Sequence, residues 1–454
     1  LQAQLAERLN PDGQPVPLIA ETGGQNAMIV DSSALVEQVV QDVMQSAFDS
    51  AGQRCSALRV LCLQDDVAER TLVMLKGAMD EAALGNPVAL ATDIGPVIDA
   101  EAQGGIQRHI DAMRARGHAV HQSARGLAQA EGQGSFVPPT LIEIGRLDQL
   151  QREVFGPVLH VLRYPRAGLD ALIDQINATG YGLTAGVHTR IDETIARVAA
   201  RIEAGNLYVN RNMVGAVVGV QPFGGEGLSG TGPKAGGPLY LLRLLTRRPA
   251  GAARLAVQAS GADEPVRTGA AVRSSPAVLL REWLHDQGEG GLAEQVARLL
   301  AQTPEPAARV LSGPTGERNL YRVVGRERVL CLAGADADRW VQLAAVLAVG
   351  AQAVWPASAQ ADWARLPPEL QSQVAVAADW QAPQVRFDAV LLHGAPQEAR
   401  DVARALVDRP GPLVGLTALP PGAADIPLER LLIERAVSTN TAAAGGNASL
   451  MTMA

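Results

Sequence analysis

The residue best suited to chemistry in this sequence is Cys55. It lies in a short loop containing Gly52, between an expected helix and an expected buried strand, and rigid elements on both sides can hold a nucleophile in place. Arg54 beside it could favour the thiolate, which is the reactive form of a cysteine. Cys62 and Cys331 lie within apolar runs, where a cysteine acts as a small hydrophobic residue. The same interpretation would apply to Cys55 if nothing else supported a catalytic role.

Support for a catalytic Cys55 comes from a carboxylate, Glu21, in the segment Ala20-Glu21-Thr22-Gly23-Gly24. A glutamate beside apolar residues has a raised pKa and can act as a general base. The two glycines that follow allow the main chain to approach a ligand closely. Taken alone, Glu21 would be an ordinary solvated loop carboxylate.

Four short motifs occur in order along the chain. They are AETGGQ (20–25), FDSAGQRCS (48–56), EVFGPV (153–158) and QPFGG (221–225). Each motif alone is a weak signal, and EVFGPV alone would indicate a helix-to-strand turn with a buried phenylalanine. The four in this order resemble the signatures of the NAD(P)-dependent aldehyde dehydrogenase superfamily, so we expect the α/β fold of that superfamily.

The resemblance implies a reaction and a role for each residue. Cys55 would attack an aldehyde carbon, and its main-chain N–H with a second donor would hold the oxyanion. After hydride transfer to the nicotinamide, Glu21 would activate the water that releases the acid from a thioester. Glu153 would accept hydrogen bonds from the nicotinamide ribose, a task for a two-oxygen acceptor. The residues implied to bind the NAD cofactor are Glu153, Phe155, Thr22 and Gly23.

Longer segments narrow the resemblance. Residues 206–244 and 438–452 resemble the proline utilization A (PutA) family of bacterial bifunctional enzymes, and the similarity covers essentially the whole chain. The C-terminal half of those enzymes oxidises L-glutamate γ-semialdehyde to L-glutamate with NAD. Main-chain N–H groups of a loop of small residues would hold the α-carboxylate of that substrate. The implied substrate-binding residues are Ser56, Gly215, Ala216 and Phe223.

Two other functions stay open. The chain could be another semialdehyde dehydrogenase with a different carboxylate-bearing substrate, which activity ratios across glutarate, succinate and glutamate semialdehydes would distinguish. It could also be a non-catalytic scaffold or lid-bearing fragment, in which Cys55 would not react with a thiol reagent. Without the resemblance, residues 214–220 would be an ordinary apolar loop or strand.

The position of Glu21 near the start departs from the family pattern, in which most of the NAD-binding domain precedes the glutamate motif. We therefore expect the chain to be the C-terminal part of a longer protein. The expected partners are the upstream NAD-binding part and an FAD-dependent proline dehydrogenase module of the same polypeptide. The resemblance also allows a homodimer in the bacterial cytoplasm and peripheral contact with the inner membrane.

The elements that must position these residues alternate between strand and helix in the first stretch of the chain. Apolar residues from Leu35 to Phe48 recur with a period of about 3.6 and predict a helix ending near Ser50. Such alternation is typical of α/β proteins. Further helices are expected at 66–83, 99–116, 167–178 and 190–204, and strands at 27–30, 57–63, 137–143, 158–163, 184–188 and 206–209.

The second stretch repeats the alternation and predicts a parallel, doubly wound Rossmann-like sheet. Strands are expected at 328–334, 352–357, 385–394 and 412–419, and helices at 336–348, 359–376 and 396–408. The turn after its first strand, AGADAD, lacks the G-x-G-x-x-G pattern, so dinucleotide binding there is poorly supported. The expected domains are a catalytic domain at 1–250, a linker at 251–275, a Rossmann-like domain at 276–437 and a tail at 438–454 that docks on the catalytic domain.

Composition excludes several classes of protein. With 39 basic and 47 acidic residues, a net charge of −8 argues against a nucleic-acid-binding face, so DNA binding is not indicated. There is no apolar run long enough to span a membrane. Three cysteines fit a reducing compartment better than a disulfide framework. His118 and His121 lie close in sequence but lack a cluster that would complete a zinc site, so no metal is expected.

Overall fold

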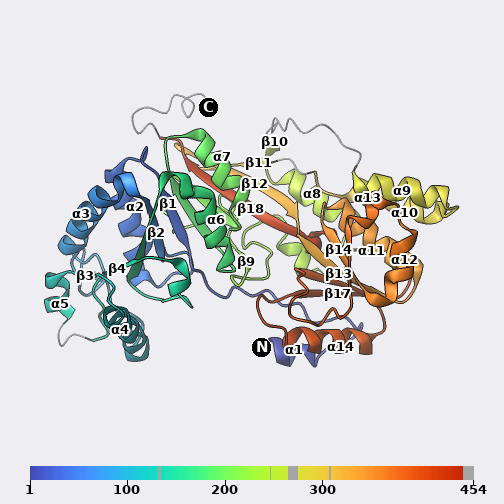
Figure 1. The fold of residues 1–454 in the computed structure, drawn as a ribbon, viewed down its shortest axis with the longest axis horizontal. Coiled ribbons are helices and arrows are strands. Elements are labelled where there is room, and N and C mark those ends of the chain that lie inside the picture. The colour runs from blue at the N-terminus through green and yellow to red at the C-terminus, as the bar shows by residue number, and fades with distance from the viewer. Residues whose placement is uncertain (131–133, 246, 264–274, 306–307, 443–454) are drawn as a thin grey trace. The chain divides into compact units, whose positions relative to one another are not determined.

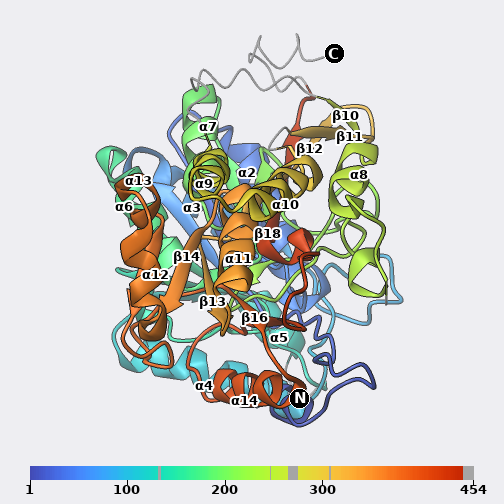
Figure 2. The same ribbon diagram turned by 90° about the vertical axis from the view of Figure 1, so that its right-hand side faces the viewer.

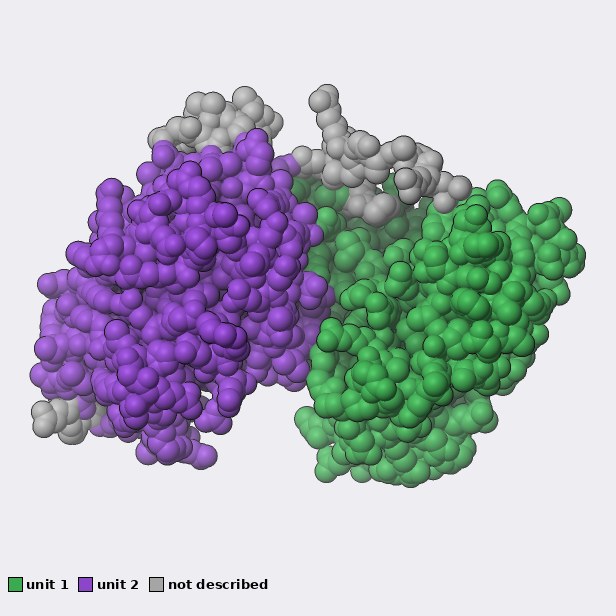
Figure 3. All heavy atoms as spheres, viewed as in Figure 1, with its two compact units in different colours: residues 1–20, 231–312, 320–435 green, residues 21–230, 313–319, 436–454 purple. Residues whose placement is uncertain are grey.

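The computed structural model describes residues 1–130, 134–245, 247–263, 275–305 and 308–442. The chain forms two compact units, coloured separately in Figure 3, and each unit is built from segments that are distant in sequence. Unit 1 comprises residues 1–20, 231–312 and 320–435, and unit 2 comprises residues 21–230, 313–319 and 436–454. The domain boundaries expected from sequence stay a prediction.

The sheet of unit 2 is parallel except at one edge (Figure 1). Its order is β8-β7-β1-β2-β5-β4-β3, with residues 436–439 of β18 beside β8. The central strands are buried on both faces, as parallel sheets require. The strands are β1 (Ala27–Val30), β2 (Val60–Gln64), β3 (Val120–Gln122), β4 (Thr140–Ile144), β5 (Val158–Tyr164), β7 (Thr184–His188), β8 (Asn206–Val209) and β18 (Leu432–Asn440).

Helices of unit 2 bury apolar side chains, and several of these helices contact the sheet. In α2 (Val36–Phe48) the buried residues recur at helical spacing, among them Val36, Val39, Val40 and Val43. Helix α2 packs against α3 (Asp65–Glu81), and Figure 1 shows the two side by side. The other helices are α4 (Ala100–Ala115), α5 (Ala124–Ala130), α6 (Leu169–Ala178) and α7 (Asp192–Arg201).

Unit 1 contains a five-stranded parallel sheet in the order β15-β14-β13-β16-β17. Counted along the chain, this is the doubly wound order 3-2-1-4-5, which confirms the Rossmann-like prediction. Helices α9 (Pro276–Asp286) and α10 (Gly290–Gln302) pack with α11 (Asp336–Ala348), as Figure 2 shows. The strands are β13 (Arg328–Ala333), β14 (Gln352–Pro356), β15 (Val374–Ala377), β16 (Ala389–His393) and β17 (Gly415–Leu419), and α14 (Pro396–Val407) lies between the last two in sequence.

Several expected elements are confirmed closely, and one expected helix is wrong. Helix 336–348 has the predicted bounds. The single helix expected at 359–376 is instead α12 (Gln360–Arg365), α13 (Pro368–Gln371) and strand β15, because Pro367 and Pro368 lack the N–H that a continuous helix needs.

The expected linker 251–275 contains helix α8 (Ala252–Ala259), which buries Ala253 and Val257, and strand β10 (Ala262–Asp263). Residues 264–274 and tail residues 443–454 lie outside the described residues. Strands β12 (Glu317–Gly325) and β18 were not predicted. Short elements not yet named are α1 (Gln2–Ala6), β6 (Tyr181–Gly182), β9 (Glu226–Gly227) and β11 (Arg309–Leu311). Within the part of the chain that the structure describes, every helix is too short or too polar to cross a bilayer.

Candidate active site

Cys55 lies in a strained loop between α2 and β2. Ser50, Ala51 and Gly52 take consecutive left-handed conformations, with φ of 57°, 53° and 64°. Such values cost energy for residues that carry a Cβ, and they cluster at functional sites. A Cβ on Gly52 would lie 2.2 Å from the carbonyl oxygen of Gly156, so only glycine fits there. The chain therefore builds this loop at a local energetic cost.

The Cys55 thiol faces the Glu21 carboxylate. The thiol is half-buried and donates a hydrogen bond to Glu21. Burial and the negative charge of Glu21 raise the pKa of the thiol, although the main-chain N–H groups of Ser56 and Cys55 partly offset this shift. The prediction that Arg54 would favour the thiolate does not match this direction. Arg54 Nε instead donates to Ser50 Oγ at 3.1 Å.

Main-chain bonds hold the exposed Glu21 in place. Glu21 forms an antiparallel bridge with Gly230, and the N–H of Thr22 donates to the carbonyl oxygen of Ser229 at 3.2 Å. The Thr22 hydroxyl donates to the carbonyl oxygen of Leu228 at 2.6 Å. Thr22 therefore supports the backbone next to Glu21, and its predicted contact with a cofactor stays a prediction.

Asn26, directly before β1, joins the glutamate segment to the cysteine loop. Its Nδ2 donates to the carbonyl oxygens of Cys55 at 2.7 Å and Ala57 at 2.8 Å, and its Oδ1 accepts from the N–H of Thr184 at 3.2 Å. Asn26 is 2% exposed, so these bonds satisfy an amide that water does not reach. Sequence reasoning missed Asn26, although a polar residue directly before the apolar run AMIV was a signal for such a role.

Glu153 is paired with a buried arginine, Arg59. Both Nε and Nη2 of Arg59 donate to Glu153 Oε1, at 3.2 and 3.1 Å. The other oxygen, Oε2, accepts from the N–H of Gly24 at 3.1 Å. Gly23 has a φ of 135°, and a Cβ there would lie 2.7 Å from the same oxygen, so glycine is favoured at this position. The structure thus places Glu153 next to Gly23 and Gly24, and the cofactor-binding roles of Glu153 and Gly23 stay predictions.

Phe155 presents a half-exposed ring beside this pair. The ring centroid lies 5.1 Å from the Arg59 guanidinium carbon, a cation–π arrangement. Phe155 remains 47% exposed, which is unusual for a large aromatic residue. A flat partner could still stack on this ring.

The segment that contains Gly215 and Ala216 follows β8 and is bonded to the last turn of α2. The N–H of Met213 donates to Ser46 Oγ at 3.0 Å, which ties this loop to the helix that precedes Cys55. Gly215 is exposed, with φ of 79°. At the other end of the loop, the N–H of Val217 donates to Gln221 Oε1 at 2.8 Å.

Phe223, close behind this loop, is half-buried. Asn206 braces its neighbours, because its Nδ2 donates to the carbonyl oxygen of Pro222 at 2.9 Å and its Oδ1 accepts from the N–H of Gly224 at 3.3 Å. Gln221 Nε2 also donates to Glu317. Ser56 is buried directly after the nucleophile. The substrate roles of Ser56, Gly215, Ala216 and Phe223 stay predictions.

Asp42 on α2 and His188 at the end of β7 form a second titratable pair. His188 Nε2 is 3.5 Å from Asp42 Oδ2. Burial lowers the pKa of His188 to about 4, and burial raises the pKa of Asp42 to about 6, partly offset by Arg211. At neutral pH His188 is therefore uncharged, and the pair is not an ion pair.

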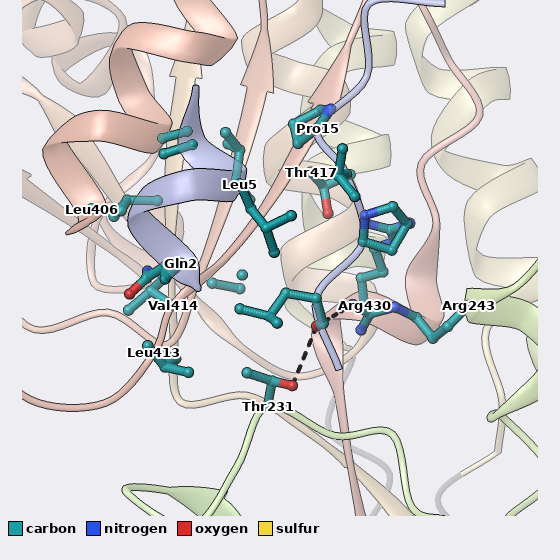
Figure 4. Close-up of a pocket in the computed structure, with 18 of the residues that line it drawn as sticks. Gln2, Leu5, Pro15, Thr231, Arg243, Leu406, Leu413, Val414, Thr417 and Arg430 are labelled. Atoms are coloured by element: carbon teal, nitrogen blue, oxygen red, sulfur yellow. Dashed lines mark hydrogen bonds between the residues drawn. The ribbon is translucent and has the colours of Figure 1, made fainter. Parts of the chain in front are cut away.

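Each unit contains a cavity. The cavity of unit 2, about 890 Å³, is lined by Gln25, Leu150 and Leu228, among others. The cavity of unit 1 is smaller, about 110 Å³, and Figure 4 shows Leu413 on one side and Arg243 on the other. Its lining includes none of the predicted site residues. Among the described residues, no group of three His, Cys, Asp or Glu side chains could hold a metal ion.

Comparison with known proteins decides the family. The model of the aldehyde dehydrogenase family matches residues 4–248. The chain belongs to the aldehyde dehydrogenase family. This match confirms the resemblance inferred from the four motifs.

Similar proteins extend over more of the chain than the family model. "Bifunctional protein PutA" of Klebsiella aerogenes is 56% identical over 452 residues, which are 98% of this chain and 34% of that protein. "1-pyrroline-5-carboxylate dehydrogenase" of Geobacillus kaustophilus is 35% identical over 229 residues, 50% of this chain and 43% of that protein. The chain thus spans about a third of the length of the PutA protein it matches.

Among solved structures, proline utilization A from Corynebacterium freiburgense is similar in fold. It superposes with a TM-score of 0.70 at 24% sequence identity, covering 97% of this chain and 40% of that chain. The likeness covers both the aldehyde dehydrogenase part and the Rossmann-like part of the fold.

Proposed function

We propose that this chain oxidises L-glutamate γ-semialdehyde to L-glutamate with NAD, as the second step of proline catabolism in a bifunctional enzyme. The observation that carries the proposal is the hydrogen bond between the Cys55 thiol and the Glu21 carboxylate, in a loop that the chain strains to form. The similarity to bifunctional protein PutA and to 1-pyrroline-5-carboxylate dehydrogenase supports the same step.

The pairing gives Glu21 two tasks. The thiol proton passes to Glu21 along the existing hydrogen bond while the Cys55 sulfur bonds to the aldehyde carbon. The carbonyl oxygen becomes an oxyanion, which the main-chain N–H of Cys55 stabilises. Loss of hydride leaves a thioester on Cys55. Glu21 passes the thiol proton to solvent and, ionised again, takes a proton from water, whose oxygen attacks the thioester carbon. The C–S bond then breaks, the acid is released, and the Cys55 thiolate recovers a proton from Glu21.

Glu153 and Phe155 fit the nicotinamide end of a dinucleotide. A carboxylate offers about four acceptor sites. Arg59 takes two on Oε1 and Gly24 takes one on Oε2, so one remains for a ribose hydroxyl. The half-exposed Phe155 ring offers a face for the nicotinamide. A bound NAD would supply the acceptor for the hydride.

The loop at Gly215 and Ala216 fits the other end of the substrate. Glycine with positive φ and a small neighbour leave main-chain N–H groups accessible to the α-carboxylate. Ser56 adds a hydroxyl next to the nucleophile, and Phe223 flanks the aliphatic stem. This loop distinguishes glutamate semialdehyde from aldehydes that lack a carboxylate.

The proposal includes the setting of the chain. Its partners are an upstream NAD-binding part and an FAD-dependent proline dehydrogenase module of the same polypeptide, and we propose a homodimer in the bacterial cytoplasm with peripheral contact to the inner membrane. Residues 438–454 are proposed to dock on the catalytic domain, although 443–454 lie outside the described residues.

The test measures NADH formation by the whole gene product with glutamate, succinate and glutarate semialdehydes. We expect the highest kcat/KM with glutamate semialdehyde. Replacing Cys55→Ala should reduce kcat by at least about 10³-fold, as loss of a nucleophile does. Cys331→Ala is the matched control, because that thiol is buried in β13. Full activity of Cys55→Ala would contradict the proposal, and a preference for another semialdehyde would change its substrate.

A further inference from the structure

Arg59 carries a charge where the chain is otherwise apolar. It lies in the run Ala57-Leu58-Arg59-Val60, directly before β2, and its side chain is only 2% exposed. Burying a charge is strongly unfavourable unless partners compensate it. A buried guanidinium in this place therefore needs a reason beyond packing.

The reason lies in its donors. Of the five N–H groups of Arg59, two are used on Glu153 Oε1. Nη1 donates to the carbonyl oxygens of Gly52 at 2.7 Å and Gly156 at 3.1 Å, and Nη2 donates to that of Arg54 at 3.1 Å. All five donors are thus satisfied, and a planar fork is the only side chain that can do this.

These bonds join three segments of unit 2. The carbonyls of Gly52 and Arg54 belong to the strained loop before Cys55, and Glu153 and Gly156 belong to the EVFGP motif. Through Oε2 of Glu153, the network also reaches the N–H group that follows Gly23. One side chain therefore fixes the nucleophile loop relative to the carboxylate and ring proposed to hold the cofactor.

The backbone of Arg59 is held as well. Its carbonyl oxygen accepts from the N–H of His160 at 2.9 Å and lies 3.2 Å from His160 Nδ1. His160 Nε2 lies 2.9 Å from His109 Nε2, so one ring donates to the other. Burial lowers the pKa of His160 to about 3, which keeps that ring neutral next to the Arg59 charge.

We propose that Arg59 is the positioning residue of this active site: it sets the distance and orientation between the Cys55 loop and the Glu153–Phe155 pair. The inference rests on the proposed function for what is positioned, but the coupling of the loops is a property of the fold alone. Arg59 is not expected to touch substrate.

The test replaces Arg59→Lys in the whole gene product. Lysine keeps the charge but has three donors on a flexible stem, so it cannot replace five hydrogen bonds to four acceptor oxygens. Hydrogen–deuterium exchange should increase by at least about tenfold in peptides covering both 50–57 and 152–157. The Kd for NAD should rise by about tenfold or more, and the pH profile of Cys55 alkylation should change.

Arg163→Lys is the matched control. Arg163 lies in the same unit and also bridges two carboxylates, those of Glu69 and Glu143, but its side chain is 42% exposed. This variant should leave exchange in both loops and Kd for NAD unchanged. If the exchange rates of peptides 50–57 and 152–157 are the same in Arg59→Lys as in the unchanged protein, the proposal is overturned.

A second variant covers the case in which Arg59→Lys does not fold. In Glu153→Gln the amide presents one acceptor oxygen where Arg59 and Gly24 need two, while Arg59 keeps its bonds to Gly52 and Arg54. Exchange should then rise in 152–157 and 22–25 but less in 50–57, and no rise in either would refute the coupling. If the unchanged protein fails to bind NAD, the proposed function fails, and the exchange data still decide the role of Arg59.

Discussion

Two buried arginines show how the two parallel sheets of this chain differ. In unit 2, Arg59 pairs with Glu153 and joins loops around a half-buried thiol and a half-exposed ring. In unit 1, Arg339 on α11 pairs with Asp362 and Asp336 and donates to the carbonyl oxygen of Ala333 at the end of β13. Arg59 thus bonds to the loop that carries the candidate nucleophile, whereas Arg339 bonds to the last residue of a strand.

The second arrangement occupies the place where Rossmann folds bind phosphate, at the turn between the first strand and its helix. Asp336 and Asp338 lie in the first turn of α11, and their negative charge disfavours an anion at that helix end. The Arg339 side chain, 7% exposed, fills the turn. A parallel sheet therefore carries the candidate catalytic residues in unit 2, whereas the corresponding turn in unit 1 is occupied by an ion pair, because sites depend on loops rather than on folds.

The largest expected contrast between the regions is in cysteine reactivity. Iodoacetamide at pH 8 should modify Cys55 at least about 100-fold faster than Cys62 or Cys331 in the native protein. Burial raises the pKa of Cys62 to about 12 and that of Cys331 still further, whereas Cys55 is partly accessible. Mass spectrometry of peptides after timed labelling measures the three rates. Comparable labelling rates at Cys55 and Cys331 would contradict the assignment of Cys55 as the accessible, reactive thiol.

The next effect concerns the structural arginine. Arg339→Met should lower the free energy of unfolding by about 3 kcal/mol, because the buried Asp362 then keeps only the half-exposed Arg365 as a cationic partner. Urea denaturation measures this loss. The double variant Arg339→Met/Asp362→Leu should recover most of it, since no charge is then left unpaired. A single variant as stable as the unchanged protein would show that Arg339 does not hold this end of the sheet.

A smaller effect on stability should appear at the pair formed by Asp42 and His188. Because the pKa of Asp42 is raised to about 6 in the folded state, folding favours its protonated form. Stability is therefore lost as the pH rises from about 4, the pKa of an unfolded aspartate, through 6. Asp42→Asn should be more stable than the unchanged protein by about 1–3 kcal/mol at pH 8 and about equal at pH 3. The opposite pH trend in urea titrations would contradict the assignment.

The smallest effect is expected at the surface of unit 2. Arg70 pairs with Glu37 at 3.1 Å, but both side chains are about two-thirds exposed. Arg70→Met should change the free energy of unfolding by less than about 0.5 kcal/mol. A larger loss in the same urea assay would mean that exposure does not separate structural from incidental ion pairs here.

Elements with a strong apolar period were predictable from sequence. The helix at 336–348 and the strands at 27–30, 184–188 and 206–209 have the expected bounds, because burial of one face or both leaves a clear pattern. Strand β4 begins at Thr140 rather than at Val137, since Pro138 and Pro139 cannot donate to a sheet. Strands β12 and β18 do alternate between buried and less buried residues, but that period was overlooked.

The site was predictable as a set of motifs but not as a network. The motifs predicted Cys55, Glu21 and Glu153 as site residues, but they did not predict a cationic partner for Glu153. The signal was present, because a single arginine in an apolar run needs a buried counter-charge, and Arg59 is that residue. The raised pKa of the Cys55 thiol could not be predicted from the sequence, because it depends on burial and on the position of the Glu21 side chain.

The most direct test of the account is the pH dependence of Cys55 alkylation with and without the Glu21 carboxylate. In the unchanged protein, the midpoint should lie above that of an ordinary cysteine, because burial and Glu21 both favour the thiol. In Glu21→Gln the midpoint should move to lower pH, while NADH formation is lost. An identical midpoint in both proteins would contradict the pairing of thiol and carboxylate on which the proposed function rests.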